Sequence, residues 1–133
     1  MFDNLNIPSI DIDLSTEGKW FEYGDTGIAF KIARNGNPQH KRALMGKANQ
    51  IKKLTEKGDF NRANRINDEM IAQFILKDWR GVKNANKSVD YTVDNGIALL
   101  TDPRYEDVAN FIADCSHEYA EYEAQETEEL VKN

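Results

Sequence analysis

The side chains best suited to chemistry in this sequence are two histidines and one cysteine. His40 and His117 fall on separate predicted helices, with no Asp/Cys/His cluster at the ligand spacing of a metal site, so we expect both to be surface histidines. Cys115 lies close to Asp114 and Glu118, whose negative charges raise the pKa of a thiol instead of producing a reactive thiolate. We therefore predict a buried, unreactive cysteine, no metal site and no cofactor.

Hydrolytic enzymes use two further patterns that bear on this sequence, the serine nucleophile elbow and the Asp-Thr-Gly triplet. None of the four serines stands in a nucleophile-elbow sequence. Asp25-Thr26-Gly27 is the triplet found in aspartic proteases, but the chain has no second copy of it and no room for two lobes. A tight turn explains the triplet better. Because no phosphate-binding glycine loop is present either, we expect a protein without enzymatic activity.

Charge is divided unevenly along the 133 residues, although the net charge is only −6. Residues 31–87 hold 14 Lys/Arg against 5 Asp/Glu, whereas residues 104–133 hold 2 Lys/Arg against 9 Asp/Glu. The length favours one domain, and no apolar run approaches the roughly 20 residues of a membrane span. The acidic N-terminus lacks the layout of a signal peptide, and a lone cysteine suits a reducing compartment, so we expect a cytoplasmic protein that contacts no membrane.

The N-terminal third predicts an arm followed by a β-hairpin. Residues 1–18 show no helical period and carry four carboxylates, which favours a flexible acidic arm. Two strand-like runs, 19–23 and 28–34, flank the turn residues 24–27. A two-stranded hairpin is marginal by itself, so its apolar face is expected to pack on helices.

Two helices are predicted next, joined as an αα-hairpin. Asn37 and Pro38 form an N-cap and first-turn signature, and this helix is expected to run to about Lys57, before Gly58. Asp59 then caps a long apolar helix over residues 59–82, which we expect to organise the core. The predicted structural core, taken over the whole chain, consists of Phe30, Leu44, Ile51, Met70, Phe74, Trp79 and Phe111.

The C-terminal third predicts two more helices. Thr92 can cap a short helix to Leu100, although Gly96 weakens it, and Asp102-Pro103 marks the start of another. The last helix should bury side chains at helical spacing: Tyr105, Val108, Phe111 or Ile112, Cys115 and Tyr119. Residues 121–133 are acidic and apolar-poor, as in a frayed tail. The predicted class is mainly α (α+β), an N-terminal β-hairpin packed on a bundle of about four helices, with one domain over residues 19–120.

The basic helix around residues 34–57 allows a second function. A stripe of Lys and Arg could contact nucleic acid. The acidic sequence pI near 4.9 and the lack of helix-turn-helix spacing oppose this hypothesis. We therefore disfavour nucleic-acid contact and keep a small nucleic-acid-binding accessory protein as the alternative.

Three segments in order give the sequence a family resemblance. FKIARNGNP (residues 30–38) resembles the opening motif of tailed-phage tail assembly chaperones, namely a strand, Ala-Arg, a polar turn and Asn-Pro. ILKDWRGV (residues 75–82) resembles their central motif, an apolar helix ending in Trp-x-Gly-Val. YTVDNGIALLTDP (residues 91–103) resembles the short helix that follows. The resemblance covers residues 18–120. Gly96 departs from it, and residues 1–17 have no counterpart.

This resemblance implies a host-cytoplasmic protein, absent from the mature virion, that binds and solubilises the tape-measure protein. It would also help recruit tail-tube subunits. In such families a programmed ribosomal frameshift adds a C-terminal extension, and this chain resembles the short form. The basic and acidic segments also permit head-to-tail self-association. We predict client contact through exposed Trp20, Phe21 and Tyr23, with Arg34 and Lys41 as charged partners.

Overall fold

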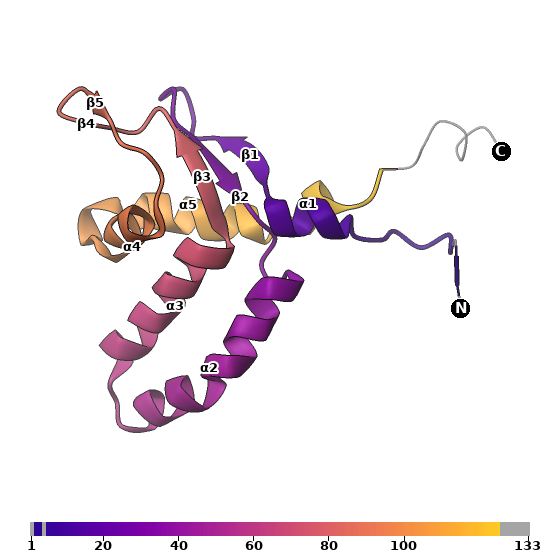
Figure 1. Ribbon diagram of the computed structural model, residues 1–133, viewed down its shortest axis with the longest axis horizontal. Coiled ribbons are helices and arrows are strands. Elements are labelled where there is room, and N and C mark those ends of the chain that lie inside the picture. Colours follow the sequence, from indigo (N-terminus) through magenta and orange to yellow (C-terminus); the bar gives the residue numbers. More distant parts are fainter. Residues whose placement is uncertain (1, 4, 126–133) are drawn as a thin grey trace.

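The computed structural model describes residues 2, 3 and 5–125 (Figure 1). Within this part of the chain, five α-helices, five strands and two 3₁₀ helices follow one another. In chain order they are α1 Ile12–Glu17, β1 Lys19–Glu22, β2 Ala29–Ile32, α2 Pro38–Glu56, α3 Phe60–Phe74, β3 Leu76–Arg80, β4 Lys83–Asn84, β5 Lys87–Ser88, α4 Val93–Thr101, η1 Pro103–Tyr105, α5 Glu106–Ser116 and η2 Tyr119–Tyr122. The predicted α+β class, rich in helix with an N-terminal β-hairpin, is confirmed.

The centre of the fold is an antiparallel sheet in the order β1-β2-β3. The predicted hairpin supplies β1 and β2, with Phe21 opposite Phe30. The third strand pairs with β2 and places Trp79 opposite Phe30. Helix α5 runs behind the sheet, and α4 lies beside one end of α5 (Figure 1). The core lies between the sheet and these helices, where Ile32, Leu76 and Ile112 are fully buried.

The long helix predicted over residues 59–82 is wrong beyond Phe74. Asp59 caps α3 as predicted, accepting a hydrogen bond from the backbone N–H of Arg62. The chain then leaves the helix, and Leu76–Arg80 form β3. Apolar residues continued the helical spacing past Phe74, but pairing with β2 satisfies the backbone of this segment as a strand. At the end of β3, Gly81 has φ +79°, and a Cβ there would lie 2.2 Å from the carbonyl oxygen of Gly27.

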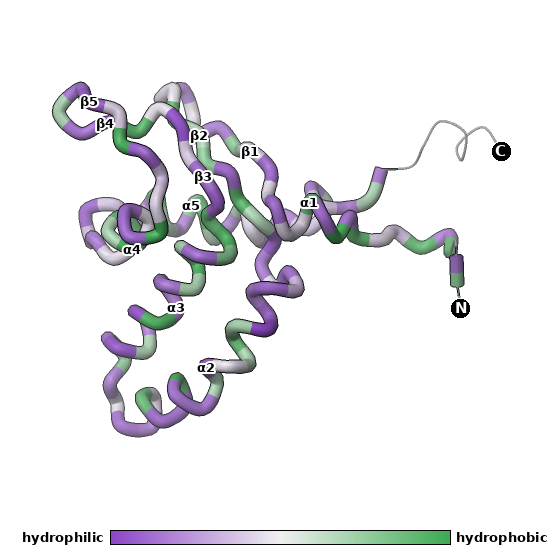
Figure 2. Tube along the Cα trace, in the orientation of Figure 1, coloured by the Kyte–Doolittle hydropathy of each residue, from purple (hydrophilic) through white to green (hydrophobic). Residues whose placement is uncertain are grey.

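Helices α2 and α3 form the predicted αα-hairpin, which extends away from the sheet (Figure 1). Hydrophilic residues dominate α2 (Figure 2). Leu44 and Ile51, predicted as core, are therefore only half-buried between the two helices. Buried Asn37 connects the two helices at the base of the hairpin. Its side-chain Oδ1 accepts hydrogen bonds from the backbone N–H groups of Gln39 and His40 at the start of α2. Its Nδ2 donates to the carbonyl of Phe74 at the end of α3, at 3.1 Å.

Five other predicted core residues have different degrees of burial. Phe30, Met70 and Trp79 are buried, as predicted. Phe74 and Phe111 are only half-buried. Ile112 replaces Phe111 as the fully buried residue of α5, while the Phe111 ring packs edge-on against Tyr23 with 4.9 Å between the ring centroids.

The expected flexible arm over residues 1–18 differs from the structure at residues 9–17. Asp11 caps α1, and residues 9–11 pair with the segment 122–124. Tyr122 anchors this pairing, because its side chain is fully buried and its hydroxyl donates to the carbonyl of Ile32 at 2.7 Å. This contact joins residues more than 100 positions apart in the same chain, so the local sequence of residues 1–18 did not indicate it.

The last α-helix is shorter than predicted, and a 3₁₀ helix follows it in place of a further α-helical turn. The α-helix ends at Ser116, and the chain continues as η2. Tyr105 and Tyr119 are 40% and 45% exposed, so their predicted burial is wrong; Tyr122 is the buried tyrosine. The change of helix type after Ser116 shifts the register of the buried face. The frayed tail predicted over residues 121–133 is wrong at residues 122–124, which pair with residues 9–11; residues 126–133 lie outside the described part of the chain.

Close packing against Tyr91 explains why a glycine occupies position 96 inside α4. A Cβ there would lie 2.6 Å from the hydroxyl of Tyr91, which is held by a hydrogen bond to the carbonyl of Ala72. Overpacking costs about 1–3 kcal/mol, whereas Gly→Ala in a helix gains only about 1 kcal/mol. We expect Gly96→Ala to lower the free energy of unfolding by about 1 kcal/mol, measured by chemical denaturation. Gly46→Ala, which meets no atom within 4 Å in α2, is the matched control and should be stabilising.

Candidate functional site

A surface groove of about 640 Å³ lies between α1 and the start of α2. Its base is formed by the turn that joins β2 to α2, including Gly36 and Asn37. The volume lies within the range typical of ligand and peptide pockets, about 300–1,000 Å³. We call this cavity the α1–α2 groove. It is lined by Ile10, Ile12, Ser15, Arg34, Gly36, Asn37, Pro38, Lys41, Arg42 and Met45.

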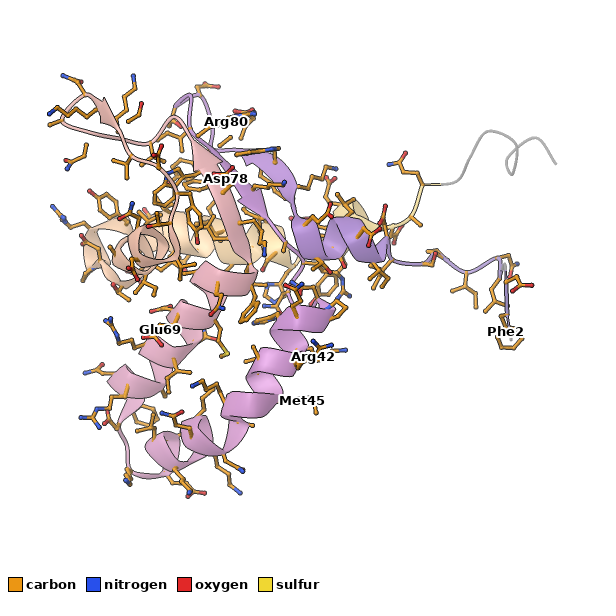
Figure 3. All side chains as sticks on the ribbon, viewed as in Figure 1. Phe2, Arg42, Met45, Glu69, Asp78 and Arg80 are labelled. Carbon is orange, nitrogen blue, oxygen red and sulfur yellow. The ribbon has the colours of Figure 1, made fainter. Side chains whose placement is uncertain are left out.

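Exposed aliphatic side chains form two walls of the α1–α2 groove. Ile10, two residues before α1, and Ile12, the first residue of α1, are 38% and 56% exposed, and Met45 on α2 is 75% exposed. Arg42 and Met45 extend from the side of α2 that faces away from α3 (Figure 3). Neighbouring exposed aliphatic residues of this kind mark sites where proteins contact other proteins.

Three cationic side chains also line the groove. Lys41 and Arg42 are exposed, and none of the three cations forms an ion pair with a carboxylate in the described part of the chain. The guanidinium carbon of Arg34 lies 4.2 Å from the centroid of the Tyr119 ring. Its Nε is buried without a hydrogen-bond acceptor among the described residues. The groove therefore offers apolar walls together with positive charge.

His40 lies buried behind the groove, so its prediction as a surface histidine is wrong; His117 is exposed as predicted. The N-cap turn at Asn37 draws the His40 ring inward, where Nδ1 accepts the backbone N–H of Gly36 at 3.0 Å. Burial lowers the pKa of His40 below its ordinary value of 6.5, and the positive charge of His117 lowers it further. Neutral His40 thus supports the turn that forms the base of the groove.

This burial predicts acid-sensitive stability. Below about pH 6.5 the unfolded chain takes up a proton on His40 before the folded chain does, so the free energy of unfolding falls as pH falls. We expect His40→Gln to have a smaller loss of stability between pH 7 and pH 5 than the wild type, in urea titrations at each pH. Equal pH dependence in the two proteins would show that His40 does not contribute.

The predicted client-contact residues lie in different places. Arg34 and Lys41 meet in the α1–α2 groove. Trp20 is 36% exposed on the opposite face of the sheet from the core, with the Arg80 guanidinium carbon 4.6 Å from its ring centroid. Phe21 and Tyr23 pack against the core and are half-buried, so their expected exposure is wrong. Alternation along β1 places them on the inner face.

Sequence reasoning missed the apolar part of the groove. Ile10 and Ile12 belong to the segment interpreted as a flexible arm, and Met45 follows Leu44 outside the predicted apolar line of its helix. An isolated exposed methionine beside basic residues was the available signal. Arg42 was one of several similar cations, and only the fold brings it beside Ile12.

Cys115 is buried as predicted, and burial, followed by the charge of Glu118, raises the pKa of its thiol to about 11.

Residues 2, 3 and 5–125 contain no cluster of three or more His, Cys, Asp or Glu side chains placed to hold a metal ion. In the same residues, no helix is both long and apolar enough to cross a membrane.

A second cavity, of about 460 Å³, lies between β3, the β4–β5 hairpin and α4. Trp79 and Phe30 contribute to its wall, and the Trp79 indole donates to the carbonyl of Val89 at 2.7 Å. Because its lining belongs largely to the core, this cavity is tied to stability. The α1–α2 groove remains the candidate contact site.

The fold is therefore that of a small α+β protein with a helical hairpin and a basic, apolar groove. Residues 32–133 match the family described as YdaY prophage protein. The chain belongs to this family and is of phage origin, as the resemblance implied. No curated protein and no solved structure matches the chain. The family description names no tail function, so the tail-assembly role is a proposal.

Proposed function

We propose that this protein is a phage tail assembly chaperone that binds the tape-measure protein and keeps it soluble. The observation that carries the proposal is the α1–α2 groove, where the aliphatic side chains of Ile10, Ile12 and Met45 lie beside three cations. A long helical client exposes amphipathic faces that aggregate in water. A groove with apolar walls can cover such a face in helix-in-groove fashion.

The ordered motifs of the resemblance support the same role, and family membership adds phage origin. Phage origin is established for residues 32–133, which include all of α2 and the other motifs of the resemblance except the first two residues of the opening strand. The role is protein binding without catalysis, in the host cytoplasm, and it includes recruitment of tail-tube subunits. We also propose that the protein leaves the particle before the virion is complete.

The test is co-expression with the tape-measure protein of the same phage. We expect the client to move from the insoluble to the soluble fraction and to co-purify with this chain. Tail-tube subunits should join the purified complex. If the client stays insoluble and no complex forms, the chaperone role is wrong.

One observation favours the alternative, nucleic-acid binding. The exposed cations of α2 have no carboxylate partner in the described part of the chain, which leaves a basic helix face available. Such binding would weaken steeply with salt, because bound counterions are released from the phosphates. A fluorescence-anisotropy titration with duplex DNA and with RNA at two salt concentrations distinguishes the roles. The alternative predicts steeply salt-dependent binding, and the chaperone proposal predicts none. The exposed cations of α2 are Lys41, Arg42, Lys47, Lys52 and Lys53, of which Lys47 lies on the side of the helix opposite to the other four.

A further inference from the structure

The N-terminal arm, defined here as residues 2, 3 and 5–9, exposes a row of large apolar side chains. Phe2 is 75% exposed, Leu5 51% and Ile7 64%. Single exposed apolar residues are ordinary on a protein surface, but three within one short segment form an exposed apolar strip that can bind another protein surface. Asp3 adds one carboxylate to this strip. The arm thus combines aliphatic and aromatic side chains with negative charge.

The α1–α2 groove has the complementary character. Its walls are aliphatic, and its cations Arg34, Lys41 and Arg42 form no ion pair with carboxylates of the described residues. The buried Nε of Arg34 lacks an acceptor among the same residues. A carboxylate-bearing segment with apolar side chains would supply what the groove lacks.

The backbone contacts of residues 9–11 direct the arm away from the groove of its own chain. Ile10 bridges to Glu123, the N–H of Asp11 donates to the carbonyl of Tyr122 at 2.9 Å, and the N–H of Ala124 donates to the carbonyl of Ser9 at 2.7 Å. These contacts fix the chain direction where it enters α1. Phe2 consequently lies far from Arg42 and Met45 of the same chain (Figure 3).

We propose that the arm of one copy binds in the α1–α2 groove of a second copy. Six extended residues span roughly 20 Å, which is enough to lay the apolar strip along the groove. Because each arm starts at the wall of its own groove, two copies can exchange arms reciprocally and close a two-fold dimer. In an extended arm Asp3, Leu5 and Ile7 point to the same side, so Leu5 and Ile7 fill the apolar part while Asp3 faces the cationic rim. This inference rests on the arm and the groove alone and does not require the tape-measure protein.

The first test is sedimentation velocity of the full chain over a concentration series, without client. We expect dimers, and we expect Leu5→Asp/Ile7→Asp to weaken dimerisation at least tenfold per side chain, since each loses the burial of an aliphatic group. Phe60→Asp changes a similarly exposed residue, 58% exposed at the start of α3, and should dimerise normally. A wild type that stays monomeric at every concentration would overturn the proposal, as would an arm variant that dimerises like the wild type.

The second test is complementation, which separates exchange between copies from a general loss of folding. An arm-defective chain (Leu5→Asp/Ile7→Asp) and a groove-defective chain (Arg42→Glu/Met45→Asp) should each be monomeric with wild-type circular dichroism. When the two chains are mixed, the intact arm of the groove-defective chain can bind the intact groove of the arm-defective chain, so we expect heterodimers. Asp3→Arg should also partly restore dimers to Arg42→Glu by reversing both charges. A mixture that remains monomeric would contradict arm exchange.

Discussion

Trp79→Ala is expected to lower the free energy of unfolding by about 3–5 kcal/mol, the usual cost of deleting a large aromatic side chain from a core. Trp79 is only 7% exposed in β3. Its ring packs edge-on against Tyr91, with 4.9 Å between centroids, and its indole N–H donates to the carbonyl of Val89 at 2.7 Å. The substitution removes the aromatic contact between the sheet and the segment before α4, and it leaves the carbonyl of Val89 without this donor.

Urea denaturation followed by circular dichroism measures this effect, and the second tryptophan provides the control. Trp20 is 36% exposed and contacts Arg80 on the outer face of the sheet. Trp20→Ala should therefore cost no more than about 1 kcal/mol. An unchanged melting temperature for Trp79→Ala would show that the core does not depend on β3 as described.

Tyr122→Ala is expected to have the second large effect, again about 3–5 kcal/mol if the cost of a buried aromatic applies. The side chain is fully buried, its hydroxyl donates to the carbonyl of Ile32, and its ring lies 6.3 Å from that of Phe21. Because residues 9–11 pair with the segment around Tyr122, the loss should also release α1.

Hydrogen exchange measures both consequences of Tyr122→Ala. Amide protection should fall in residues 9–17, which pair with the segment around Tyr122, more than in the α2–α3 hairpin. Tyr119→Ala is the matched control, because Tyr119 is 45% exposed and contacts Arg34 through its ring face. It should cost about 1 kcal/mol or less. Equal protection of residues 9–17 in Tyr122→Ala and the wild type would contradict the anchoring role.

Local signals in the sequence predicted the parts of the fold that depend on local chemistry. Asn37, Asp59, Thr92 and Asp102 each cap the helix or turn expected of them, because a cap requires only its own side chain and the next few N–H groups. The turn at residues 24–27 likewise joins β1 to β2. These features are encoded within a few residues of each other.

Features that depend on distant partners could not be predicted in the same way. The predicted helix placed Ile75 and Trp79 on its apolar face after Phe74, and only pairing with β2 makes Leu76–Arg80 a strand. Burial of Tyr122 instead of Tyr119 follows from the turn after Ser116 and from a contact with Ile32, ninety residues away in the chain. The α1–α2 groove combines Ile10 and α1 with the β2–α2 turn and α2, so its apolar part emerged only with the fold.

The α1–α2 groove unites the two proposals. The same apolar walls and cations can receive a client segment during tail assembly or the arm of a second copy when no client is present. Competition between these occupants would keep the groove covered until the tape-measure protein is made. An apolar surface kept covered in this way is less prone to aggregation.

The most direct test of the account is the amount of tape-measure protein that co-purifies with three versions of this chain: wild type, Met45→Asp and Phe60→Asp. Both substitutions place a carboxylate at an exposed apolar position, but only Met45 lines the α1–α2 groove. We predict that Met45→Asp retains at most about a tenth of the client held by the wild type, whereas Phe60→Asp retains it fully. Equal retention by Met45→Asp and the wild type would contradict the claim that this groove covers the client.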